Sequence, residues 1–118
     1  MRVLICGNNS IIVMDLAGLL EELGHTICGT AKSCAKALDL IKADRPDVAV
    51  VDLNLDDGHT GLFLIEVLAG MNVPSIIISA EASFVPEGCS ALARIEKPFT
   101  SAAIADALRL LDRSAPAL

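Results

Sequence analysis

Three side chains with complementary chemistry, Asp52, Ser79 and Lys97, each stand at or just past the end of a short apolar run. Together they suit acyl-phosphate chemistry. The Asp52 carboxylate attacks phosphorus, the Lys97 ammonium group offsets phosphoryl charge, and the Ser79 hydroxyl donates a hydrogen bond to a phosphoryl oxygen. These side chains can act on one phosphoryl group only if the fold brings them to one place.

Five short runs of mainly apolar, often β-branched residues predict strands, because turn residues bound them. The predicted strands cover residues 2–6, 25–30, 48–51, 75–79 and 93–96. Helices are predicted between and after these strands, because apolar residues recur there every three or four positions. They start at the capping residues Asn9 or Ser10, Ser33 and Thr100, and a further helix covers residues 62–71.

Strands and helices alternate, so right-handed crossovers predict an α/β fold with a doubly wound parallel sheet and helices on both faces. Ligands of such sheets bind beyond the carboxyl ends of the strands. Asp52, Ser79 and Lys97 all fall at that edge, where Gly7 and Asn8 follow the first strand. The sequence therefore predicts one site, at the carboxyl edge of the sheet.

Composition narrows the class of protein. The 118 residues fit a single domain over residues 1–113 with a tail over 114–118, and the 53% hydrophobic content excludes disorder as the main state. The net charge of -6 has the wrong sign for nucleic-acid binding. No apolar run is long enough for a membrane-spanning helix, there is no signal peptide, and the four cysteines form no CxxC pair. We expect a cytoplasmic protein that binds neither nucleic acid nor membrane.

Two stretches, residues 46–55 (PDVAVVDLNL) and 96–99 (EKPF), carry a specific resemblance, and residues 2–5 and 15–25 support it. The chain resembles the receiver domains of two-component response regulators over essentially its whole length. The resemblance implies a flavodoxin-like, five-stranded sheet of order 2-1-3-4-5. It also implies Asp52 as the phosphoacceptor, Ser79 as the switch hydroxyl, and Lys97 followed by Pro98, which in this family usually has a cis peptide bond.

The sequence departs from this family where a metal would bind. Two acidic residues normally follow the first strand, but Gly7 and Asn8 stand here instead. The resemblance implies Mg²⁺ on Asp52, helped by the Asn8 amide oxygen and the backbone carbonyl of Asn54. Because Mg²⁺ is usually held by one or two carboxylates plus substrate oxygens, we expect a weak magnesium site.

A second departure lies between the fourth and fifth strands. Only residues 80–92 connect them, with Pro86 and Gly88 inside, so the helix expected there is shortened or replaced by a loop. Arg94 stands where the family usually has an aromatic that moves with the switch hydroxyl. Phe84 either takes a related role or closes the core from the loop.

Two functions remain open from the sequence. The first is a stand-alone receiver that takes a phosphoryl group on Asp52 from a histidine kinase or a histidine phosphotransfer protein, and that signals to a downstream effector or as a homodimer. Such a protein is no enzyme beyond catalysing its own phosphorylation. The second is a pseudo-receiver that docks proteins without phosphate. Asp52, Ser79 and Lys97 favour the first, whereas Gly7, Asn8, Arg94 and the short crossover over residues 80–92 favour the second.

Overall fold

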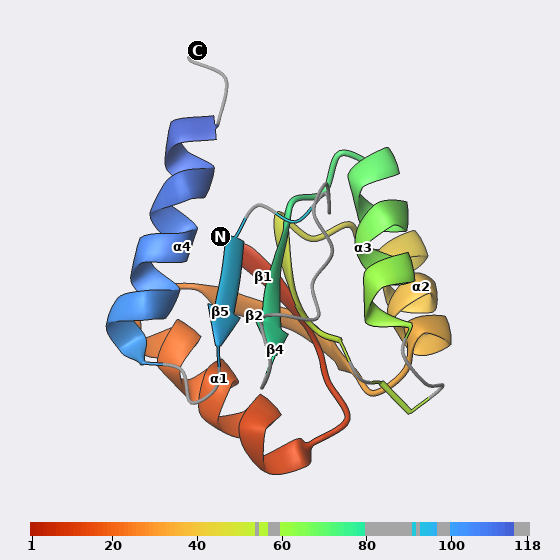
Figure 1. The fold of residues 1–118 in the computed structure, drawn as a ribbon, viewed down its shortest axis with the longest axis horizontal. Helices are drawn as coiled ribbons and strands as arrows, with labels where there is room; N and C mark the ends of the chain where they lie inside the picture. Colours follow the sequence, from red (N-terminus) through yellow and green to blue (C-terminus); the bar gives the residue numbers. More distant parts are fainter. Residues whose placement is uncertain (54, 57–59, 80–90, 92, 97–99, 115–118) are drawn as a thin grey trace.

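The computed structural model describes residues 1–53, 55–56, 60–79, 91, 93–96 and 100–114. Five strands form one parallel sheet (Figure 1). They are β1 (Arg2–Cys6), β2 (Thr26–Ala31), β3 (Val48–Asp52), β4 (Ser75–Ser79) and β5 (Ala93–Glu96). Their order in the sheet is β2-β1-β3-β4-β5, which confirms the predicted flavodoxin-like arrangement.

Four helices cover the two faces of this sheet. They are α1 (Ser10–Glu22), α2 (Cys34–Ala43), α3 (Gly61–Gly70) and α4 (Ser101–Ser114), and α4 follows β5. Figure 1 shows α1 and α4 on one face and α2 and α3 on the other. No helix in the described part of the chain has the length and apolar character that crossing a membrane requires.

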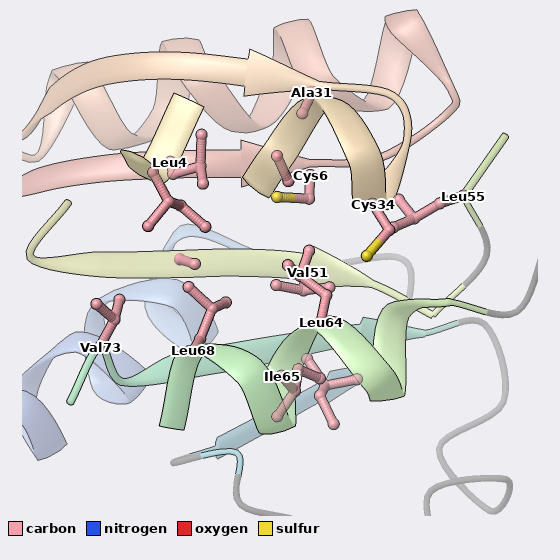
Figure 2. Close-up of a cluster of buried hydrophobic side chains, with 14 of the residues drawn as sticks. Leu4, Cys6, Ala31, Cys34, Val51, Leu55, Leu64, Ile65, Leu68 and Val73 are labelled. Carbon is pink, nitrogen blue, oxygen red and sulfur yellow. The ribbon is translucent and has the colours of Figure 1, made fainter. Parts of the chain in front are cut away.

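Alternation along the strands divides the core into two clusters. Leu4 and Cys6 pack towards α2 and α3, in the cluster drawn in Figure 2. Val3 and Ile5 pack on the opposite face, against α1 and α4. This is the period of two that a strand imposes on its side chains. The central strand β3 is buried along its whole length, which explains its unbroken apolar sequence.

The edge strand β2 begins and ends one residue later than the sequence predicts. It is only partly buried, and its pairing with β1 shifts register between Val3 and Leu4. An edge strand has a neighbour on one side only, so its sequence carries a weaker apolar signal than that of a central strand. Because β2 ends one residue later than predicted, Ala31 belongs to the strand, where it pairs with Cys6.

Side-chain caps fix the starts of three helices as predicted. The Asn9 side chain accepts hydrogen bonds from the backbone N–H groups of Ile11 (3.1 Å) and Ile12 (3.3 Å) at the start of α1. Ser33 accepts one from Lys36 N–H (3.1 Å) before α2, and Thr100 accepts one from Ala103 N–H (3.1 Å) before α4. Each cap satisfies a donor that has no partner within its helix.

Two of the predictions about the fold fall outside the described residues. Residues 80–90 and 92 hold the crossover from β4 to β5, so the prediction of a shortened or missing helix there stays a prediction. The same is true of the tail beyond residue 114.

Candidate functional site

Asp52 ends the central strand β3 and is buried, with 8% of its surface exposed. It is the only buried carboxylate among the residues that the structure describes. β3 pairs with β1 on one side and with β4 on the other, where Ile78 lies opposite Asp52. Burying a carboxylate costs free energy, so a largely buried aspartate at the rim of the sheet is a candidate functional residue.

Gly7, the first residue after β1, lies against Asp52. A Cβ atom at Gly7 would stand 3.7 Å from the Asp52 Cβ and 3.2 Å from the Val13 Cγ2. The Gly7 N–H donates a hydrogen bond to the Ala31 carbonyl (2.8 Å), which holds this residue between β1 and β2. Gly7 therefore leaves space beside the carboxylate that a side chain would fill.

Gly61, the first residue of α3, approaches the backbone of Asp52 from the other direction. A Cβ atom there would contact the Asp52 carbonyl oxygen and lie 2.7 Å from the Leu53 Cα. The Gly61 N–H donates to the Leu53 carbonyl (3.2 Å). Sequence analysis missed this residue because a glycine in a turn-rich loop is unremarkable, and α3 was predicted to start one residue later.

The two asparagines after β1 have different surroundings. Asn8 is exposed, as a ligand at the rim would be. The Asn9 side-chain oxygen already accepts two backbone hydrogen bonds as the cap of α1. Asn8 thus remains as the candidate amide ligand, as predicted, and Asn54 lies outside the described residues.

These residues suit a magnesium ion poorly. Mg²⁺ usually takes one or two carboxylates and demands octahedral oxygen geometry. The first turn of α1 carries no acidic residue, and no cluster of three metal-ligating side chains occurs in the described ranges. Asp52 would be the single buried carboxylate in such a site, and Asn8, the candidate amide ligand, is exposed.

The sheet brings the backbone of Ser79 to the same edge as Asp52. Ser79 ends β4 and pairs in register with Glu96, the last residue of β5. Ile78, the residue before Ser79, lies opposite Asp52. Arg94 lies in β5 and pairs with Ile77 of β4, two residues before each strand ends. Lys97, Pro98 and Phe84 lie outside the described residues, so their predicted roles stay predictions.

Cys6 is the last residue of β1 and directly precedes Gly7. Burial, together with the neighbouring Cys34 and Cys28, raises the pKa of its thiol to about 12. The thiol is therefore protonated near neutral pH and is a poor nucleophile. Cys6 is therefore a residue of the hydrophobic core and takes no part in chemistry at the rim.

The chain matches the family model described as response regulator receiver domain over residues 3–109. It therefore belongs to the receiver domain family, whose members act in two-component signalling. This confirms the resemblance seen in residues 46–55 and 96–99.

Characterised relatives agree with this assignment. The phyllosphere-induced regulator PhyR of Methylorubrum extorquens is 34% identical over 115 residues, covering 91% of this chain and 43% of the relative. The transcriptional regulatory protein PdtaR of Mycobacterium tuberculosis is 28% identical and covers 92% of this chain and 55% of the relative. The chain thus spans about half the length of these relatives.

Solved structures show the same fold. The PhyR receiver domain of Erythrobacter litoralis matches with a TM-score of 0.86 and 27% identity, over 99% of this chain and 95% of that one. SdrG of Sphingomonas melonis matches with a TM-score of 0.82 and 29% identity, over 94% and 95%.

Proposed function

We propose that this receiver domain accepts a phosphoryl group on Asp52 from a histidine kinase or a histidine phosphotransfer protein, and that it signals through altered protein contacts. One observation carries the proposal. Asp52 is a buried carboxylate at the end of the central strand, beside the space that Gly7 leaves open. A downstream effector or a second copy of the chain would receive the signal.

The proposed reaction is an in-line transfer. A carboxylate oxygen of Asp52 attacks the phosphorus atom, an oxygen–phosphorus bond forms, and the bond from phosphorus to the donor's imidazole nitrogen breaks. The electron pair of that bond stays on the nitrogen. The sheet topology supports proximity of Ser79, whose hydroxyl would donate to a phosphoryl oxygen, and Lys97 would offset the charge that develops there.

We expect acceptance to be slow because the carboxylates that attract Mg²⁺ in typical receivers are absent. Charge compensation then falls to side chains of the chain itself. The same absence supports a second candidate function, a pseudo-receiver that docks its partners without phosphate. Gly7 and Asn8 are the observations that favour it.

Phosphoramidate labelling followed by intact-mass spectrometry separates the two candidates. The wild-type chain should gain one phosphoryl group, and Asp52→Asn should gain none. Asp56→Asn is the matched control, because Asp56 is an exposed carboxylate on the segment that follows β3, and it should label like the wild type. Labelling is measured with magnesium and with a chelator. If a folded wild-type chain stays unlabelled in both, the docking function replaces the phosphoacceptor function.

A further inference from the structure

A surface hollow adjoins Gly7 on the side away from Asp52. Its volume is about 160 Å³, roughly ten times the 10–15 Å³ that one water molecule needs. Ser10, Thr30 and Lys32 are its polar wall residues, and Val13 and Met14 contribute apolar atoms. The hollow therefore has room for a group the size of phosphate.

Lys32 gives this hollow a positive charge. It is exposed, and it directly follows Ala31 at the carboxyl end of β2. Its backbone carbonyl accepts a hydrogen bond from the Asp56 N–H (2.8 Å), which ties it to the chain segment after Asp52. In the described part of the chain, no carboxylate forms an ion pair with Lys32. An exposed ammonium group on the wall of the hollow attracts anions.

The hollow lies near Asp52, at the same edge of the sheet. β1 alone separates β2 from β3, so the backbones of Lys32 and Asp52 lie about two strand spacings apart, roughly 10 Å. Gly7 stands between them, and it lines both this hollow and a smaller one against Asp52.

We propose that this hollow binds a phosphate-like oxyanion, with Lys32 as a positioning residue that supplies positive charge near Asp52 in place of a strongly held metal ion. The use of the hollow in transfer rests on the proposed phosphoacceptor function. Anion binding itself does not, so the two can be tested separately. The ligand class is a phosphate-like oxyanion.

The binding arm uses Asp52→Asn, which cannot be phosphorylated, in the presence of a chelator. Inorganic phosphate is titrated while backbone amide shifts are followed by NMR at constant ionic strength. Saturable shifts at Gly7, Thr30 and Lys32 are expected. Adding Lys32→Gln should weaken binding about fivefold, the effect of one exposed charge pair. The control Lys42→Gln removes the same charge from the last turn of α2 and should change nothing.

The transfer arm uses the wild-type Asp52 and phosphoramidate. Inorganic phosphate should compete with labelling, and Lys32→Gln should raise the KM for phosphoramidate without a matching loss of kcat. Equal phosphate affinity in Lys32→Gln and Lys42→Gln, or labelling that phosphate does not inhibit, overturns the inference. Absence of labelling in the wild type instead overturns the proposed function, and the binding arm then decides whether the hollow takes an anion.

Discussion

At the amino-terminal end of the sheet, charged side chains bind groups within the chain, whereas at the carboxyl end two glycines lie against one buried carboxylate. Arg2 pairs with Asp44, and its backbone N–H donates to the Asp47 carboxylate (2.8 Å). The Arg45 guanidinium donates to the Met71 carbonyl after α3. These contacts tie β1, α2 and α3 together. At the other end, Gly7 and Gly61 let backbone approach Asp52 without any side chain between.

The comparison shows how one sheet divides two tasks. Charged pairs at the amino-terminal end bind partners within the chain, so they fix the positions of elements. Glycines and asparagines at the carboxyl end leave room for a group from outside. The following four variants test this division, in order of decreasing expected effect.

Restoring the missing acids should have the largest effect. Gly7→Asp with Asn8→Asp adds two carboxylates beside Asp52, each contributing roughly 1–4 kcal/mol of attraction to a cation about 4 Å away. The Kd for Mg²⁺, measured by calorimetry, should fall at least about tenfold. The aspartate at position 7 requires Val13 to shift by a few tenths of an ångström.

Ala43→Asp adds a carboxylate at the amino-terminal end of the sheet and is the matched control for added charge. It should leave the Kd unchanged. An unchanged Kd in the double variant as well would show that the carboxyl end cannot form a metal site even with its acids present.

Gly61→Ala tests whether the close contact with Asp52 is essential. Its Cβ atom would overlap the backbone of Asp52 and Leu53, so the free energy of unfolding should fall by about 1–3 kcal/mol. Gly70→Ala in the same helix meets no atom within 4 Å and should change stability little. Urea unfolding gives both values. Equal stability of the two variants would contradict the contact.

Asn9→Ala removes the cap of α1 and should lower the free energy of unfolding by about 1 kcal/mol. Ser33→Ala removes the cap of α2 and should cost a similar amount. Neither should change the Kd for Mg²⁺, because the Asn9 oxygen is committed to the backbone of α1. Weaker magnesium binding in Asn9→Ala alone would assign Asn9 to the site.

Asp44→Asn should have the smallest effect, because the pair with Arg2 is exposed to solvent. The Arg2 guanidinium lowers the pKa of Asp44 below its ordinary value of 3.8. Because the pKa of Asp44 is lower in the folded chain than in the unfolded chain, the pair stabilises the folded chain at pH values above the ordinary pKa. This contribution is lost as the pH falls through the lowered pKa. Urea midpoints of the wild type and variant should differ slightly at pH 7 and converge below pH 3.8. A difference that persists in acid would point to another cause.

Much of the fold could be predicted because its central strands are buried on both faces. The run Val48 to Val51 admits only one interpretation at that length, and Asp52 ends it as a polar residue. The caps Asn9, Ser33 and Thr100 were recognisable because their chemistry is local. β2 was placed one residue early, since an edge strand is half exposed and lacks that signal.

The site was predicted less completely. Asp52, Ser79 and Lys97 follow from the rule that function gathers beyond strand ends. β2 ends at Ala31, so the same rule points to Lys32. The predicted strand ended at residue 30, so from the sequence the rule pointed to Ala31 instead. Gly61 gives no such signal, because its importance depends on which backbone it meets in three dimensions.

The close approach of Gly61 to the backbone of Asp52 places the first turn of α3 directly against the peptide group of the proposed phosphoacceptor. Because no side chain lies between them, we expect a displacement of that peptide group to move the first turn of α3. A spectroscopic label on the exposed Phe63 position would report chemistry at Asp52 from the outer surface of the domain.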